Sequence, residues 1–243
     1  MSYSVIAPLY DRINGDQYEP YAAFLRQVFS RFGSIPVKEV LDLGCGTGSI
    51  AALLADDFDM VGLDASTEML SIAMEKNAGK NTLLLCQDMR EFELYGTVQG
   101  VYSSFDCLNY LKPEDLGKVF SLVHNYLEPG GVFVFDVNTP YRFKTTYADR
   151  DYILEDEGTM CCWRNRLNKK GDVVDFYLTV FEERDGVWHR TDGVERERAY
   201  GLRAIENALN SVGLELCDVS AGYGFEKPGK TTERWYITAK KPL

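Results

Sequence analysis

The amino-acid sequence predicts an α/β protein in which a mostly parallel, doubly wound sheet is interrupted by an antiparallel β insertion. Short apolar runs alternate with longer helical patterns over residues 36–140 and again from residue 200, as in βαβ units. Between them, residues 141–199 alternate polar and apolar side chains by twos, as antiparallel hairpins do. We therefore expect one domain, residues 1–140 and 200–243, that carries residues 141–199 as an inserted β lid.

Five strands and four helices are expected before the insertion. Each strand is a short apolar run bounded by a loop or a helix start, and the fifth is apolar enough to be buried on both faces. Ser66 has the side chain of a helix N-cap, and Pro129-Gly130-Gly131 ends the helix before the fifth strand. The strands are residues 37–43, 60–64, 82–86, 100–105 and 132–137; the helices are about 20–32, 49–55, one from Ser66, and 113–127.

The insertion and the segment after it complete the pattern. Lys169-Lys170-Gly171-Asp172 and Asp185-Gly186 are turn signals that separate three alternating runs. These runs, residues 159–167, 173–182 and 187–200, are expected to form an antiparallel meander. A helix over residues 202–212 and strands over residues 214–219 and 234–240 then return to the main sheet.

Charge and composition exclude several classes of protein. With 26 Lys and Arg against 37 Asp and Glu, the net charge is −11, which opposes binding to polyanions. No block of Lys and Arg resembles a nucleic-acid footprint. The N-terminus has no signal-peptide pattern, and no run approaches the ~20 apolar residues of a membrane span. The six cysteines have no metal-ligand spacing. We expect a reduced cytoplasmic protein without metal, nucleic acid or membrane partners.

The end of the first strand runs into a glycine-rich loop through Asp42-Leu43-Gly44-Cys45-Gly46-Thr47-Gly48. Glycine allows positive φ and close approach of a ligand, and the next helix aims free N–H groups into the same crevice. A plain turn without ligand is one interpretation. A dinucleotide fingerprint is a second, but its third glycine stands three residues after its second, whereas Gly46 and Gly48 are two apart. The third is a loop for S-adenosylmethionine, with Asp42 as the acid before the first glycine.

Two further acids follow the next two strands. Asp64 ends the second strand, where a carboxylate can accept hydrogen bonds from both ribose hydroxyls of a nucleotide. Asp88 follows the third strand, where a carboxylate can accept from the exocyclic amine of adenine while Met89 packs on the ring. Because the carboxyl ends of parallel strands share one edge of a sheet, these acids and the glycine loop should lie together.

These motifs resemble those of class I S-adenosylmethionine-dependent methyltransferases. The resemblance rests on the glycine loop, Asp64, Gln87-Asp88-Met89 and Leu127-Glu128-Pro129-Gly130-Gly131, and it covers roughly residues 36–140 and 201–240. It implies a Rossmann-like, seven-stranded sheet whose last strand is antiparallel. The tyrosine-rich N-terminus and the β insertion are similar to those of small-molecule members, the sugar N,N-dimethyltransferases and the glycine N-methyltransferase group. Val98-Gln99 departs from the Phe-Asp that relatives often have there.

The resemblance implies a cofactor, S-adenosylmethionine, that lies across the glycine loop, and an insertion that covers the active site. If the acceptor binds in the same crevice as the cofactor, Tyr10 and Tyr18 are expected to fold over it and help to exclude water. The residues expected to bind the cofactor are Asp42, Gly44, Cys45, Gly46, Gly48, Asp64, Ala65, Met69, Asp88, Met89, Ser104, Phe105 and Tyr18.

Residues after the fourth strand are the candidates for catalysis. That strand lies beside the first, so Asp106, Asn109 and Tyr110 should face the transferred methyl group and could orient or deprotonate an acceptor. The alternative is that Asp106 caps a helix while Tyr110 packs in the core. His124 and His189 are interpreted as surface residues, and no Ser–His–Asp or Cys–His spacing supports covalent catalysis.

The sequence therefore predicts a methyltransferase that modifies a nitrogen or oxygen of a small polar metabolite, as a monomer or homodimer. Alternatives are a nucleic-acid or protein methyltransferase, or a non-catalytic protein that binds S-adenosylmethionine. The chain lacks the tetrad of Asn or Asp, two prolines and an aromatic residue that amino-methylating enzymes of DNA and RNA place after the fourth strand. Its acidity also opposes phosphate binding.

Overall fold

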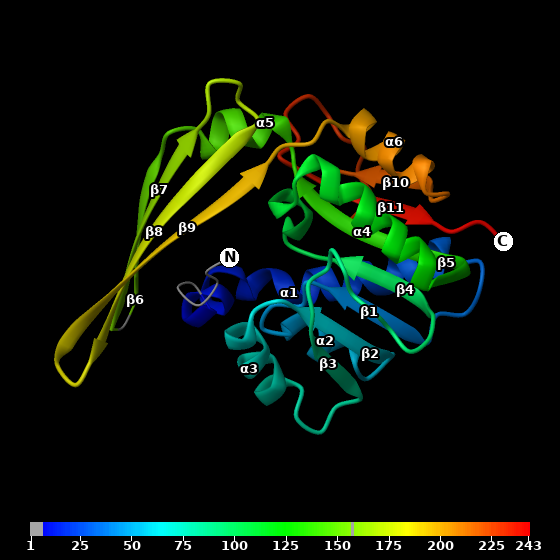
Figure 1. Ribbon diagram of the computed structural model, residues 1–243, viewed down its shortest axis with the longest axis horizontal. Coiled ribbons are helices and arrows are strands. Elements are labelled where there is room, and N and C mark those ends of the chain that lie inside the picture. Colours follow the sequence, from blue (N-terminus) through cyan, green and yellow to red (C-terminus); the bar gives the residue numbers. More distant parts are fainter. Residues whose placement is uncertain (1–6, 157) are drawn as a thin grey trace.

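The part of the chain described by the computed structural model, residues 7–156 and 158–243, is built on a seven-stranded sheet, sheet A (Figure 1). Its spatial order is β10-β11-β5-β4-β1-β2-β3. Only β11 is antiparallel to its neighbours, β5 and β10; the other adjacent pairs are parallel. The predicted sheet with an antiparallel last strand is confirmed. Its strands are β1 (Glu39–Leu43), β2 (Asp59–Asp64), β3 (Thr82–Cys86), β4 (Val98–Ser103), β5 (Leu127–Asn138), β10 (Glu215–Ser220) and β11 (Arg234–Lys240).

Helices cover both faces of sheet A. On one face, α1 (Ala7–Phe32) and α2 (Ser49–Leu54) bury apolar side chains against alternate residues of β1 and β5, such as Val40 and Val134. On the other, α4 (Pro113–Tyr126) and α6 (Leu202–Ser211) pack on Leu41 and Phe135. α3 (Thr67–Lys76) lies beside α2 and begins at the predicted N-cap, where Ser66 Oγ accepts from Met69 N at 3.2 Å. Among the described residues, no helix is long and apolar enough to cross a bilayer.

Two sequence expectations about sheet A and its helices are wrong in detail. The first helix does not begin near Pro20 but runs through it, because Asp11 ties the preceding turns to α2 and α3. The fifth strand begins five residues earlier than expected and is not wholly apolar, since it contains the fully buried Asp136. This carboxylate belongs to the site described below.

The insertion forms a separate antiparallel sheet, sheet B, as predicted. Its strands β6 (Asp151–Asp156), β7 (Thr159–Leu167), β8 (Val173–Arg184) and β9 (Val187–Arg198) pair in chain order. β6 was not expected from the sequence. A short α5 (Pro140–Arg142) and a π-helix, η3 (Phe143–Tyr147), connect β5 to sheet B. Figure 1 shows sheet B standing beside the carboxyl edge of sheet A, with one face toward the N-terminal part of α1.

Candidate functional site

A cavity of about 370 Å³ lies between the carboxyl edge of sheet A and the inner face of sheet B. The glycine loop contributes Gly44 and Gly46 to its wall, and the turn after β4 contributes Ser104–Cys107. α1 adds Tyr10 and Asn14, and sheet B adds aromatic and acidic side chains. Residues from both ends of the chain and from the insertion therefore meet at one place.

Gly44, Gly46 and Gly48 of the loop all have positive φ (85°, 53° and 69°), but the space around them differs. A Cβ at Gly44 would overlap the sulfur of Cys107, and one at Gly48 would lie 2.8 Å from the Cβ of Ala73 in α3. At Gly46 nothing lies within 4 Å of such a Cβ. Gly44 and Gly48 thus permit close packing, whereas Gly46 presents open backbone to the cavity.

Asp64 fixes the glycine loop and also lines the cavity. Its Oδ2 accepts from the N–H of Gly46 at 2.9 Å, and its Oδ1 accepts from the N–H of Ser66 at 2.8 Å. Burial raises the pKa of Asp64, while these backbone donors oppose that rise. A carboxylate has about four lone-pair sites, so Asp64 keeps acceptor capacity for hydroxyl groups of a ligand.

Asp42 lies beneath the loop with one oxygen unsatisfied. The hydroxyl of Tyr102 donates to Oδ2 at 2.6 Å, but the buried Oδ1 has no partner. Burial raises the pKa of Asp42 to about 7, and Asp64 adds to this rise while Tyr102 opposes it. Asp42 borders a small hollow of about 20 Å³ that Tyr18, Cys45 and Ser104 also line. A cationic or donating group in this hollow would satisfy the free oxygen.

A carboxylate of α1 holds that helix against the loop. Oδ1 of Asp11 accepts from the hydroxyls of Thr47 at 2.6 Å, Ser49 at 3.0 Å and Tyr18 at 2.9 Å. Its other oxygen forms an ion pair with Lys76 of α3. This cluster explains why α1 begins well before Pro20. It also holds Tyr10 and Tyr18 beside the two hollows, where the sequence led us to expect these tyrosines.

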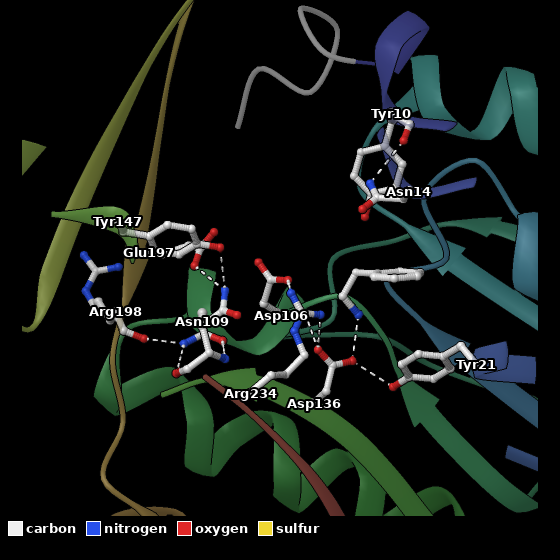
Figure 2. Close-up of polar contacts among 12 residues, drawn as sticks. Tyr10, Asn14, Tyr21, Asp106, Asn109, Asp136, Tyr147, Glu197, Arg198 and Arg234 are labelled. Carbon is white, nitrogen blue, oxygen red and sulfur yellow. Dashed lines mark hydrogen bonds and ion pairs between the residues drawn. The ribbon is translucent and has the colours of Figure 1, made fainter. Parts of the chain in front are cut away.

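The turn that carries Asp106 is held by a buried carboxylate (Figure 2). Phe105 and Asp106 both have φ of 54°, a left-handed conformation that is uncommon outside glycine. Asp136 accepts from both backbone N–H groups at 2.8 Å, from the Tyr21 hydroxyl at 2.7 Å and from Arg234 Nη1 at 2.6 Å. These four donors compensate the strain of the turn and fix the direction of the Asp106 side chain.

Asp106 lies between an arginine of sheet A and a glutamate of sheet B. Arg234 Nη2 donates to Asp106 Oδ1 at 2.6 Å. From β9, the buried Glu197 shares a hydrogen bond with Asp106. Burial, with Asp106 nearby, raises the pKa of Glu197 well above its usual range. Figure 2 shows Glu197 and Tyr147 on one side of Asp106 and Tyr10 and Asn14 on the other.

Asn109 does not face the cavity, contrary to expectation. It is fully buried, its Oδ1 accepts from Asn138 N, and its Nδ2 donates to the carbonyls of Asn138 and Arg198. Asn138 ends β5 and Arg198 ends β9, so Asn109 joins the two ends of the insertion (Figure 2). Both polar atoms of its amide are therefore engaged within the protein. Tyr110, by contrast, lines the cavity.

The other predicted cofactor residues divide into two groups. Met69, Ser104 and Phe105 line the large cavity, as do Gly44, Gly46 and Asp64. Asp88, Met89, Ala65 and Gly48 do not. Asp88 is engaged by Arg90, whose Nε and Nη2 lie 2.8 and 2.5 Å from its oxygens. These four residues adjoin the edge of the sheet, and their role toward a cofactor stays a prediction.

Sequence reasoning missed Asp136, Glu197, Arg142 and Arg234. Asp136 had a visible signal, since it is an acid within an otherwise apolar strand. Glu197 falls at an inward position of the alternating pattern of β9. Arg142 and Arg234 carry no local signal, because each reaches the site only through tertiary packing.

Comparisons with known proteins agree with this geometry. A family model described as a methyltransferase domain matches residues 40–131. A protein of Geobacillus sp. (strain WCH70) named as a methyltransferase is 30% identical over 247 residues, covering 99% of this chain and 100% of the relative. The crystal structure of an S-adenosylmethionine-dependent methyltransferase from Clostridium acetobutylicum ATCC 824 matches with a TM-score of 0.89 and 29% identity over 100% of both chains. The dTDP-3-amino-3,4,6-trideoxy-alpha-D-glucopyranose N,N-dimethyltransferase of Streptomyces venezuelae is 28% identical, covering 86% of this chain and 90% of its own.

The residues at the loop fit S-adenosylmethionine. Gly46 leaves space for close approach, Asp64 offers acceptor capacity, and the free oxygen of Asp42 suits the positive charge of this cofactor. The full-length match to the Geobacillus protein and the matched domain agree with that fit. The chain belongs to the S-adenosylmethionine-dependent methyltransferases.

Proposed function

We propose that the protein transfers the methyl group to a nitrogen or oxygen atom of a small polar molecule bound between the glycine loop and sheet B. The observation that carries this proposal is the shared wall of one cavity, where Gly46 and Asp64 lie with Asp106 and Glu197. A volume of about 370 Å³ is within the range of small-molecule sites. The Streptomyces venezuelae relative, by its name, methylates an amino sugar nucleotide, which supports an acceptor of this kind of size and polarity.

The cofactor supplies, when bound, a methyl group on a positively charged sulfur, so that no residue need activate a leaving group. Asp106 can accept a hydrogen bond, and then a proton, from the N–H or O–H of the acceptor. Arg234 and Asp136 hold Asp106 in position before any ligand binds. α1 and sheet B close opposite sides of the cavity and exclude water.

The net charge of −11 disfavours a nucleic acid as the methyl acceptor, because the protein would repel a polyanion. Acids also line the cavity itself, including Asp106, Glu195 and Glu197. We accordingly expect a small-molecule acceptor, no nucleic-acid partner, and a monomer or homodimer.

The direct test is release of S-adenosylhomocysteine. Purified protein is incubated with S-adenosylmethionine and pools of small amines, hydroxy acids and amino sugars, and the product is quantified by mass spectrometry. We expect turnover with one pool, and much slower turnover of the same pool by Asp106→Asn. If the protein binds the cofactor but releases no product with small molecules, peptides or RNA, it is a binding protein and the proposal is wrong.

Asp106→Asn and Tyr110→Phe should each lower turnover by ~10²-fold or more if the residue takes part in proton transfer. Affinity for S-adenosylhomocysteine should change only a few-fold, since neither side chain belongs to the glycine loop. Asp192→Asn is a matched control, because Asp192 lies on the exposed side of sheet B and bonds to Thr179 and Arg190. Unchanged rates in both site variants would place acceptor chemistry elsewhere.

A further inference from the structure

The inner face of sheet B carries buried polar groups without a partner. Trp163 and Asn165 stand two residues apart on β7, so they share the inner face of sheet B. Neither the Nε1 of Trp163 nor the Nδ2 and Oδ1 of Asn165 has a hydrogen-bond partner, and Asn165 is only 1% exposed. Both residues line the 370 Å³ cavity.

Arg142 adds a cationic side chain with an unpartnered N–H to the same cavity. Its Nε is buried without a partner, and its guanidinium lies 5.0 Å above the ring of Tyr147. Among the described residues, Arg142 forms no ion pair, whereas Arg234 in the same wall contacts two carboxylates. Buried polar groups in native proteins are nearly always paired, because leaving them unpaired destabilises the fold. Unpaired donors on the wall of a cavity therefore indicate a ligand.

Phe176 separates these donors from the acids of the cavity. It lies in the middle of the inner face on β8, opposite Asn165 of β7 and opposite Glu195 of β9 in the strand register. Glu197 and Asp106 lie on the β9 side, while Trp163 and Asn165 lie on the β7 side. In the register of sheet B, Asn165 and Glu195 thus lie on opposite sides of the Phe176 ring.

We propose that Trp163, Asn165 and Arg142 form a subsite for an oxyanion, a carboxylate or phosphate, carried by the methyl acceptor at the end away from the methylated atom. This inference rests on the proposed function, since it assigns the two ends of the acceptor to the two sides of the cavity. The nucleophilic nitrogen or oxygen lies toward Asp106 and Glu197, and the oxyanion lies toward β7 and α5. Such an acceptor satisfies the free donors and keeps its negative charge away from Glu195.

Thermal stability tests whether the amide of Asn165 is unpaired without ligand. Asn165→Leu should raise the Tm of the free protein by about 2–4 °C, because it removes an unsatisfied buried amide from a chain of this size. The matched control is Asn109→Leu, which deletes a buried amide with all its partners present and should lower the Tm. A fall in Tm for Asn165→Leu would mean that its amide is already satisfied, and would overturn the subsite.

Binding of small oxyanions tests the chemistry of the proposed subsite before the acceptor is known. The Tm is measured in sodium phosphate or sodium acetate against sodium chloride at equal ionic strength, with and without S-adenosylhomocysteine. One of the two oxyanions should stabilise the wild type more than chloride does, and the gain should be lost in Arg142→Gln and Trp163→Phe. The second substitution keeps the ring but removes the N–H. Equal stabilisation of wild type and variants, or none by either oxyanion, would overturn the proposal.

The two proposals fail in different ways. If S-adenosylhomocysteine binds and the phosphate effect is present but no small molecule turns over, the proposed reaction is wrong while the subsite stands. If turnover is found but Arg142→Gln and Asn165→Leu keep the wild-type KM for the true acceptor, the subsite is wrong while the proposed function stands.

Discussion

The two walls of the cavity differ in how completely their polar groups are paired. On the sheet A side, Asp136 accepts four hydrogen bonds and Asp64 accepts two from the backbone. One oxygen of Asp42, beneath the glycine loop, is the exception there among the acids of the site. On the sheet B side, Trp163 and Asn165 have side-chain atoms without any partner. Under the proposed function, the turn that holds Asp106 is fixed by folding alone, whereas the side formed by Trp163 and Asn165 is completed by the bound acceptor.

Replacing residues 141–199 with a short Gly-Ser linker should have the largest effect, because it removes the sheet B wall and leaves the sheet A wall. Turnover should fall by ~10³-fold or more, because the residues that position the acceptor and exclude water are removed. Affinity for S-adenosylhomocysteine, measured by calorimetry, should stay within a few-fold, since the loop and Asp64 lie outside the insertion. Full activity would show that sheet B is no lid. A truncated chain that fails to fold would show that the insertion belongs to the core.

Asp136→Ala should destabilise the sheet A wall. The substitution leaves Arg234 short of one buried partner and frees the N–H groups of Phe105 and Asp106, so the free energy of unfolding should fall by about 3–5 kcal/mol. Urea denaturation measures it. Asp175→Asn is the control: this acid pairs with Arg196 on the exposed face of sheet B, and such pairs contribute about 0–1 kcal/mol. Similar losses for both variants would refute the central role of Asp136.

Asp64→Ala should lower cofactor affinity at least tenfold, because charge-assisted hydrogen bonds contribute about 1.5–3 kcal/mol each. Asp88→Ala provides a second acid of the same sheet edge with which the effect of Asp64→Ala can be compared. Asp88 is bound by Arg90 outside the cavity, so its loss should cost less than the loss of Asp64. Calorimetry of both variants decides, and an unchanged affinity in a folded Asp64 variant would rule out its ribose role.

The smallest expected effect is a pH dependence from Asp42. Its pKa of about 7, against 3.8 for a free carboxyl, means that folding favours the protonated form, so stability from this group is lost as pH rises from about 4 to 7. A cationic cofactor favours the ionised form instead. Cofactor affinity should therefore rise by less than tenfold per pH unit up to about pH 7 and then level off, with proton release below pH 7. Calorimetry at pH 6 and 8 in two buffers measures both, and Asp42→Asn should abolish the dependence. Affinity that is flat with pH in the wild type would contradict this role.

The sequence was most informative where the site depends on local order. The glycine loop and Asp64 could be placed because each follows a strand whose end fixes its position at one edge of the sheet. Asp106 could be placed for the same reason, although its left-handed turn could not, since that conformation depends on Asp136 thirty residues away.

Features that depend on tertiary contacts were beyond sequence reasoning. Asn109 looked like an acceptor-binding amide, yet both of its polar atoms are used within the protein. The start of α1 was missed because Pro20 suggested a helix N-terminus, whereas Asp11 contacts residues of α2 and α3. β6 was missed because its short run, Asp151–Asp156, has acids at both ends and few alternating positions.

The amide of Asn109 has a consequence for how the chain can change during evolution. It holds the last residue of β5 beside the last residue of β9, so the insertion begins and ends at one point of the sheet. A loop whose ends are already joined can be lengthened cheaply, since each doubling of its length adds only about 0.6 kcal/mol of closure entropy. Selection can therefore replace or resize the segment between Asn138 and Arg198, and with it the molecule that is methylated, without rebuilding the sheet that binds the methyl donor.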